Sequence, residues 1–406
     1  MSLKNAIGGV ALIAGTAIGA AVLALPIITA HLGFAQTIAI YCTCWFFMTL
    51  GALYLLEANL LVGYGTNLIS MAEATLGQFG KYFTWGIYLI LLYALTAAYL
   101  SGVGAWIQRG FELIHVSLNP FGCASVATFL TMIVIWLGTA VTDWVNRFLV
   151  IGLIGAFAIL LFIVSEHIQF ELLFIQNNTF DLSPIPIIIT AFGSAIVIPT
   201  LTEYLHGKPK QLLYVVLIGS VIPLLVYIIW EFVILGIIPV SGNPGLLQIQ
   251  QHGHPVTDVP AALQALLQNR IITKASTYFS IFALITSLLG VCLSLFDFLA
   301  DGLHLHKTIR SRILLTLITF VPPLCFIIFY PHGFTVALSF AGIFVAILLG
   351  ILPAVMAWQG RYHLKQEKPL QIIGGKFLII VTIAFFLFVC AIECFNQYKT
   401  FLGASS

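Results

Sequence analysis

Charged side chains are scarce in this chain of 406 residues: they make up 7% of it, whereas hydrophobic residues make up 61%. No polar stretch is long enough for a separate soluble domain, so the composition indicates an all-α polytopic protein embedded in a lipid bilayer. Clusters of Lys and Arg are also missing, and the net charge is only +2. Because phosphate binding requires such clusters, the sequence argues against nucleic acid as a partner.

The sequence also lacks ligand sets for metals and cofactors. The seven cysteines match neither a metal site nor a disulfide framework. The ten histidines fall in loops or near the ends of apolar segments, and the pairs His252/His254 and His304/His306 have no third ligand nearby. Neither a catalytic cluster nor a repeated pore motif is evident. We therefore expect no metal, no cofactor, no obligate protein partner, and neither an enzyme nor a channel.

Apolar runs near the roughly 20 residues that cross a bilayer predict eleven membrane-spanning helices. The first run extends to His31, which is too long for the apolar core of a signal peptide, so we expect it in the mature protein. The predicted spans cover residues 5–31, 34–62, 82–108, 124–141, 145–165, 184–204, 211–238, 273–300, 311–330, 334–358 and 374–395.

The basic residues are divided unevenly between the two sides of these spans. With the N-terminus inside, twelve of the 16 Lys and Arg fall on the cytoplasmic side. The other side holds Arg109, Arg270, Lys274 and Lys399. The positive-inside rule therefore predicts a cytoplasmic N-terminus and, after an odd number of spans, a C-terminus outside.

Two of the predicted spans contain helix-breaking clusters. The first span carries Ala14-Gly15-Thr16-Ala17-Ile18-Gly19-Ala20 and then Pro26, and the sixth carries Phe192-Gly193-Ser194 between two prolines. An unwound stretch at membrane depth is tolerated only where it faces protein or a polar ligand, so both clusters predict a binding site. Their offset of five spans predicts a five-plus-five inverted repeat with substrate between the halves.

This repeat divides the chain into residues 1–165, residues 184–358 and an appended helix at 374–395. Residues 240–272, with a helical pattern at 259–270, are predicted to form an outer lid. Residues 67–76 are predicted to form a short amphipathic helix along the membrane surface.

Several motifs together resemble a known family. They are Ala14 to Ala20 with Leu25-Pro26, Tyr93 to Tyr99 with Ser101-Gly102, Asn146-Arg147-Phe148-Leu149, Ile218-Gly219-Ser220 with Ile222-Pro223, Thr286-Ser287, Leu295-Phe296-Asp297 and Phe329-Tyr330-Pro331. In this combination they resemble the bacterial hydroxy and aromatic amino acid permeases, most closely the tyrosine permeases, over almost the whole chain.

The resemblance implies a leucine-transporter-like fold of the APC superfamily in the bacterial inner membrane. It also implies proton-driven import of an aromatic amino acid, with tyrosine first, and the broken helices indicate alternating access. Where tyrosine permeases tend to have a Phe-Gly-Phe-His-Gly break, this chain has Phe192-Gly193-Ser194-Ala195-Ile196. The choice among tyrosine, tryptophan and phenylalanine, a broader specificity, and a receptor that binds without transport stay open.

Small residues at the first break are the predicted cradle for a substrate carboxylate, because they let a ligand approach the backbone. A close helix-packing seam of the GxxxG type is the alternative. Tyr93 and Thr96 in the third span are further candidates, although such residues often only hydrogen-bond a neighbouring helix. The predicted substrate-binding residues are Gly15, Thr16, Ile18, Gly19, Ala20, Tyr93, Thr96, Phe192, Gly193 and Ser194.

Candidates for ion or proton coupling are fewer. By analogy with sodium-coupled members of the fold, hydroxyls of Thr286 and Ser287 with carbonyls of Ala14 and Ala17 would hold Na⁺. Intramembrane carboxylates are costly and therefore functional candidates, and they are Glu57, Glu203, Glu231 and Asp297. By analogy with the fold we expect a structural role for Glu57, which would accept hydrogen bonds from free amides of a broken helix. We expect Asp297 either to relay protons or to pair with Lys307 or Arg310.

Overall fold

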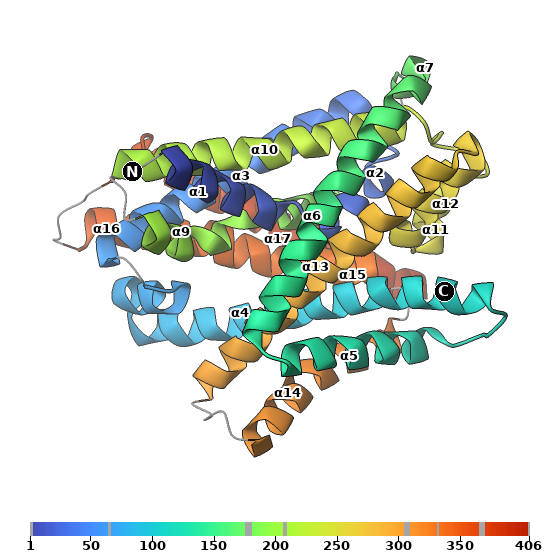
Figure 1. Ribbon diagram of the computed structural model, residues 1–406. Helices are drawn as coiled ribbons and strands as arrows, with labels where there is room; N and C mark the ends of the chain where they lie inside the picture. The colour runs from blue at the N-terminus through green and yellow to red at the C-terminus, as the bar shows by residue number, and fades with distance from the viewer. Residues whose placement is uncertain are drawn as a thin grey trace.

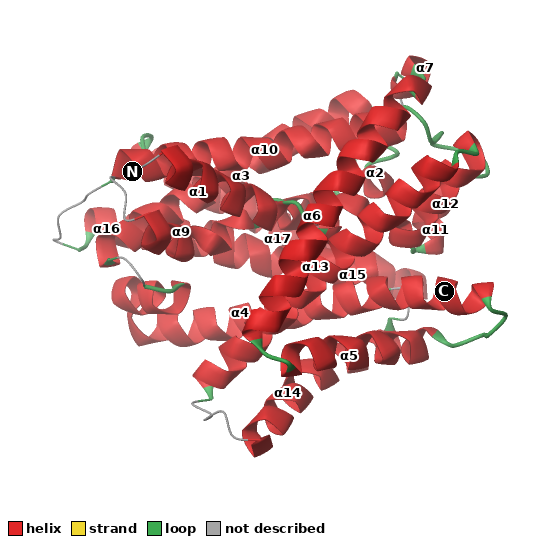
Figure 2. Ribbon diagram, viewed as in Figure 1, coloured by secondary structure: helices red, strands yellow, loops and turns green. Residues whose placement is uncertain are grey.

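The computed structural model describes residues 3–63, 66–174, 181–205, 209–303, 309–330, 333–364 and 370–404. All regular secondary structure in these ranges is helical (Figure 2). His304, His306 and Lys307, named above, lie outside them. The α-helices are α1 Leu3–Ala17, α2 Leu25–Ile28, α3 Phe34–Val62, α4 Leu68–Leu113, α5 Pro120–Trp136, α6 Thr139–Val164, α7 Phe170–Leu173, α8 Ile185–Ala191, α9 Ile198–Leu205, α10 Pro209–Leu235, α11 Leu246–His252, α12 Pro255–Leu267, α13 Arg270–Gly302, α14 Ile309–Phe329, α15 Phe334–Val345, α16 Leu352–Tyr362 and α17 Gly375–Ala404.

Short segments of other helix types complete the described fold. They are the 3-10 turns η1 Ala20–Leu23, η2 Ser165–His167 and η3 Ser194–Val197, and the π-helical segment η4 Ala346–Ile351. The first and third of these turns carry the chain through the two predicted breaks. The π segment joins α15 to α16 within one predicted span.

In the described part of the chain, nine helical segments are long and apolar enough to cross a membrane, and the bent pair α1 and α2 makes a tenth. The remaining predicted span, the fourth, corresponds to α5, a shorter apolar helix of 17 residues. Figure 1 shows the two termini at opposite ends of the helix bundle, as an odd number of crossings requires. The all-α membrane class is confirmed, and the count of eleven stays a prediction.

The fourth predicted span is shifted from its expected position. It was expected at 124–141, but α5 begins at Pro120, where the Asn119 side chain accepts a hydrogen bond from the Gly122 amide over 2.7 Å. Asn at the N-cap followed by Pro is a strong start signal. The helix ends at Trp136 and the chain turns at Gly138, which has a φ of 102°. The local capping residues therefore set the boundaries of this span.

The third predicted span and the short helix before it form one element. Helix α4 starts after Asn67, whose side chain accepts from the Ser70 amide, and it is interrupted at Gly77, with a φ of 73°. Glycine adopts this backbone conformation without the steric cost that a side chain adds. The kink separates the segment predicted at 67–76 from the long helix that follows.

Two helices form the segment predicted as a lid. Helices α11 and α12 replace the single helix expected at 259–270, and α12 ends at Leu267 because Gln268 adopts a left-handed conformation with a φ of 48°. Helix α12 packs on α13, and α11 packs on α2. Figure 1 shows both near α2, at the end of the bundle opposite the N-terminus.

Both predicted breaks are present. Helix α1 ends at Ala17, Gly19 is extended, and the two halves of the first span meet at an angle of 50°. Pro26 lies in the first turn of α2, where its missing N–H costs nothing. In the sixth span α8 ends at Ala191, and Phe192 and Gly193 leave helical geometry before η3. The breaks expose backbone groups inside the bundle.

Candidate functional site

The two breaks meet at the side chain of Tyr227 on α10. Its hydroxyl lies 2.7 Å from the Ala17 carbonyl oxygen and 2.8 Å from the Ala191 carbonyl oxygen. These carbonyls belong to the last turns of α1 and α8, which have no partner within their own helices. A phenol has a single hydrogen to donate, so the two oxygens share one donor. Together they can accept further hydrogen bonds, for example from an ammonium group.

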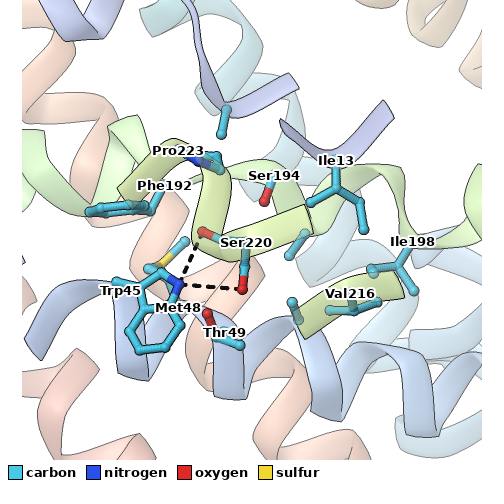
Figure 3. A pocket seen from close by; sticks show the side chains of 13 residues that line it. Ile13, Trp45, Met48, Thr49, Phe192, Ser194, Ile198, Val216, Ser220 and Pro223 are labelled. Atoms are coloured by element: carbon cyan, nitrogen blue, oxygen red, sulfur yellow. Dashed lines mark hydrogen bonds between the residues drawn. The ribbon is translucent and has the colours of Figure 1, made fainter. Parts of the chain in front are cut away.

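Phe192 closes the site beside Tyr227. The ring centroids of the two residues are 5.0 Å apart with the planes inclined at 59°, and Phe192 is buried. A cavity of about 10 Å³ lies next to them, lined by residues of α1, α3, η3 and α10. Figure 3 shows Trp45 of α3 beside this cavity, its indole N–H donating to the Ser220 carbonyl oxygen. The cavity has room for about one water molecule and none for an amino acid.

The far side of the first break is held by Ser287 of α13. The Ala20 amide donates to Ser287 Oγ over 3.0 Å, and the Tyr99 hydroxyl of α4 interacts with the same Ser287 side chain. A Cβ atom on Gly19 would lie 2.8 Å from Ser287 Oγ. The glycine therefore allows α13 to approach the unwound backbone closely.

The predicted carboxylate cradle is divided between two sides of the first span. Gly19 and Ala20 lie against Ser287, whereas Gly15 and Thr16 are exposed and Ile18 is half-buried. The Thr16 hydroxyl donates to the Leu12 carbonyl oxygen of its own helix. Nothing lies within 4 Å of a Cβ placed on Gly15, so the alternative GxxxG packing seam does not form there.

The second break contributes Phe192 and Ser194 to the lining of the small cavity. Gly193 sits between them, and a Cβ there would lie 3.0 Å from the Thr190 carbonyl oxygen. The predicted residues of the sixth span therefore surround the point where the two breaks meet.

The third span reaches the site through Tyr99. Tyr93 donates instead to the Ile318 carbonyl oxygen of α14 over 2.8 Å. Thr96 is fully buried and donates to Leu92 of its own helix. The structure thus brings neither Tyr93 nor Thr96 to the breaks. Sequence reasoning missed Tyr227, whose one signal is a hydroxyl in the middle of an otherwise apolar span.

The oxygens expected to hold Na⁺ all have protein partners in this conformation. The Ala14 carbonyl accepts from the Ile18 amide and the Ala17 carbonyl from Tyr227. The Thr286 hydroxyl donates back to Phe282 of its own helix, and Ser287 accepts from Ala20. Groups of three or more His, Cys, Asp or Glu arranged for a metal ion are not found among the described residues.

Glu57 forms a buried ion pair rather than a contact with a broken helix. Arg361 of α16 donates through Nε to Oε1 and through Nη2 to Oε2, both over 2.6 Å, and the Ile372 amide donates to Oε2 over 3.1 Å. Glu57 is 6% exposed and Arg361 is 4% exposed. The expectation that amides of a broken helix hold Glu57 is therefore wrong. The pair ties α3 to α16 and to the chain that leads into α17.

Glu231 is a second buried carboxylate, one turn beyond Tyr227 on α10. It is fully buried, with Oε1 2.6 Å from Thr29 Oγ1 and with Oε2 accepting from the Tyr41 hydroxyl over 2.7 Å. Asp297 lies half-buried near the end of α13, and the exposed Asp301 lies one turn further on. The structure therefore places Glu231, and not Asp297, next to the broken first span.

A histidine and a carboxylate meet just beyond α2. His31 Nε2 is 2.9 Å from Asp181 Oδ2, and Ser183 donates to the same carboxylate through its amide and its hydroxyl. Burial raises the pKa of Asp181, but the hydrogen bonds from Ser183 and the nearby His31 outweigh it and hold this pKa below its usual value. The pair connects the end of α2 to the segment that leads into α8.

Residues 2–393 match the tryptophan/tyrosine permease family. The tyrosine-specific transport system 1 of Haemophilus influenzae is 32% identical over 393 residues, covering 96% of each chain. The tryptophan-specific transport protein of Pseudomonas aeruginosa is 31% identical over 371 residues, covering 87% of this chain and 86% of that protein. These relatives are named as transporters and not as enzymes.

A solved transporter has a similar fold. The crystal structure of the Eremococcus coleocola manganese transporter matches with a TM-score of 0.60 and 12% sequence identity, over 95% of this chain and 84% of that one. At this low identity the likeness bears on the fold alone.

Proposed function

The chain belongs to the tryptophan/tyrosine permease family, and from this premise we propose that it imports an aromatic amino acid, tyrosine foremost, by proton symport. The observation that carries the proposal is the convergence of the Ala17 and Ala191 carbonyls on Tyr227, at the point where the two broken spans meet. Secondary transporters place substrate between such interrupted helices. A soluble amino acid has both a cation and an anion to bind there.

The substrate amine binds the carbonyl oxygens of Ala17 and Ala191. Three N–H donors of an ammonium group supply the hydrogens that the single Tyr227 hydroxyl lacks. The substrate carboxylate binds the unwound backbone at Gly19 and Ala20, where it takes the place of Ser287 as acceptor for the Ala20 amide. The breaks thus supply acceptors for one end of an amino acid and donors for the other.

The substrate ring occupies the space next to Phe192. Because the present cavity has room for about one water molecule, this conformation is closed, and substrate entry requires Phe192 and the broken helices to move. Such movement of one bundle against the other is alternating access. The proposed halves are residues 1–165 and 184–358, with 374–395 appended.

The transporter lies in the bacterial inner membrane with its N-terminus in the cytoplasm and its C-terminus in the periplasm. The distribution of Lys and Arg supports this orientation, and the termini at opposite ends of the bundle support an odd number of spans. In this orientation α11 and α12 cover the periplasmic side. Substrate enters from that side and leaves to the cytoplasm.

The hydrogen bonds made by the candidate sodium ligands favour proton coupling over sodium coupling. The two hydroxyls that would hold Na⁺ are engaged in hydrogen bonds within the protein: Ser287 accepts from the Ala20 amide, and Thr286 donates back to its own helix. A sodium site would require these contacts to rearrange together. A proton requires only one carboxylate that can bind it.

Uptake of labelled tyrosine into proteoliposomes tests the proposal. An imposed pH gradient should drive accumulation, an imposed sodium gradient should not, and unlabelled tryptophan and phenylalanine should compete better than leucine or serine. Uptake driven by sodium alone would refute proton symport. Equal competition by leucine and serine would refute the preference for aromatic substrates.

A further inference from the structure

Three carboxylates are buried in the described part of the chain, and they differ in their partners. Glu57 is paired with Arg361. Glu393 of α17 accepts from Gln397 Nε2 over 2.6 Å, from Asn396 Nδ2 over 3.3 Å and from the Ser339 hydroxyl. Glu231 has two hydroxyl partners and, among the described residues, no basic one. The first two sites supply three donors each for an ionised carboxylate, whereas the third supplies two hydroxyls, one of which also lies at hydrogen-bond distance from a backbone carbonyl.

The contacts around Glu231 contain too few hydrogens for an ionised carboxylate. Thr29 Oγ1 lies 2.7 Å from the Leu25 carbonyl oxygen and 2.6 Å from Glu231 Oε1, and the Tyr41 hydroxyl lies 2.7 Å from Oε2. These are three oxygen–oxygen contacts at hydrogen-bond distance, and each needs one hydrogen. The two hydroxyls supply only two.

A proton on Glu231 supplies the third hydrogen that these three contacts need. Glu231 then donates from Oε1 to Thr29, Thr29 donates to the Leu25 carbonyl, and Tyr41 donates to Oε2. A neutral acid also avoids the cost of a fully buried charge without a counter-charge. Hydrogen count and burial therefore lead to the same protonation state.

We propose that Glu231, Thr29 and Tyr41 form a proton-binding site that is loaded in this conformation. Loss of the proton leaves two hydrogens for three contacts, so the Thr29 hydroxyl must donate either to the Leu25 carbonyl within α2 or to Glu231 on α10, and the link between α2 and α10 changes. Because α2 is one half of the broken first span, the charge of Glu231 sets the position of that half. The role in transport rests on the proposed symport, whereas the protonation does not.

Among the titratable groups in this region, Glu231 is the one that we expect to change charge. The elements around it also carry Tyr41 on α3, Tyr227 on α10, His31 just beyond α2 and Glu171 on α7, and further along α3 and α10 lie Cys44, Glu57, Lys210 and Tyr214. Tyr41 and Tyr227 are fully buried, His31 pairs with Asp181, and Glu171 is exposed. A buried phenol does not ionise readily, since its anion would also lack a counter-charge.

Infrared difference spectroscopy of the reconstituted full-length protein tests the protonation directly. The wild type minus Glu231→Gln spectrum at neutral pH should contain the carbonyl band of a protonated carboxylic acid, shifted by deuterium exchange. The wild type minus Glu393→Gln spectrum should contain ionised carboxylate bands instead. Ionised carboxylate bands in the first spectrum would overturn the proposal. Gln keeps the shape of a protonated Glu, so Glu231→Gln should fold, and thermal unfolding in detergent checks that Glu393→Gln is folded as well.

Transport by the same variants tests the coupling. Glu231→Gln should lose accumulation of labelled tyrosine under a pH gradient but keep exchange of internal for external tyrosine, which needs no net proton movement. Glu393→Gln should keep both activities. Accumulation by Glu231→Gln at the wild-type level would refute its role in coupling. A wild-type protein that exchanges tyrosine but ignores the pH gradient would instead refute proton symport itself.

Discussion

Replacing Gly19 with Ala should slow transport by disturbing the first break. The new Cβ would lie 2.8 Å from Ser287 Oγ, which no real contact permits, whereas Ser287 Cβ lies 4.0 Å away at an ordinary distance. The Ser287 hydroxyl must therefore rotate away, and the Ala20 amide loses its acceptor. Gly19 itself has a φ of −134°, which alanine also adopts, so backbone strain adds nothing.

The magnitude follows from the lost hydrogen bond. A buried N–H without a partner costs about 1–3 kcal/mol, which shifts a two-state equilibrium away from the closed conformation by roughly 5- to 150-fold. Because the transport cycle passes through a closed state, the initial rate of uptake should decrease by a factor within this range. The bulkier Gly19→Leu should abolish uptake while the protein remains in the membrane.

Initial rates of tyrosine uptake into proteoliposomes measure the effect. Ser287→Ala removes the same acceptor without the clash, so the double variant should be no slower than the slower single variant. Gly155→Ala on α6, where a new Cβ meets no atom within 4 Å, is the matched control and should transport normally. Additive losses in the double variant, or wild-type rates for Gly19→Ala, would refute the reasoning.

Three further predictions follow from other contacts. Glu57→Gln leaves the buried Arg361 without its counter-charge and should lower the free energy of unfolding by about 3–5 kcal/mol; thermal unfolding in detergent measures this, and an unchanged midpoint would contradict the ion-pair argument. Tyr99→Phe removes the hydroxyl that interacts with Ser287 and should change tyrosine affinity, whereas Tyr93→Phe should not, which competition assays with both variants can compare. The pKa of Asp181 lies below its usual value, so its contacts stabilise the fold above the unfolded-state value of about 3.9 and are lost as the pH falls through the lower folded-state value. The wild type should therefore be more stable than Asp181→Asn at neutral pH and lose this advantage in strong acid, and a difference independent of pH would contradict the assignment.

The breaks could be predicted from the sequence because their signals are local. Glycine and proline clusters within an apolar run identify the interruptions at Ala17 to Ala20 and at Phe192 to Ser194 without knowledge of the packing. The residue that joins them could not be predicted in this way. Tyr227 bonds Ala17 across 210 positions of sequence and Ala191 across 36. Which hydroxyl reaches two freed carbonyls depends on how α10 packs between them.

The partner of Glu57 was missed for a related reason. Counting Lys and Arg by loop treats every basic residue near a span end as solvated. Arg361 lies in the last turn of α16, but it is buried and reaches Glu57 across 304 positions.

Helical spacing along the third span also did not show which of its side chains lie near the breaks. Six residues turn a helix through about one and two-thirds turns, so Tyr93 and Tyr99 point to different sides.

Helix α10 holds both halves of the broken first span from one face. Tyr227 and Glu231 are four residues apart, and residues at this spacing lie above one another on a helix. Tyr227 binds the end of α1, and Glu231 binds Thr29 at the end of α2. At each of these two sites the protein's hydroxyl groups supply fewer hydrogens than there are oxygen–oxygen contacts. The substrate ammonium group supplies the missing hydrogens at Tyr227, and a proton supplies the missing one at Glu231. Substrate and proton would therefore stabilise the same arrangement of α1, α2 and α10. Symport then needs no further link between the two sites than one turn of helix.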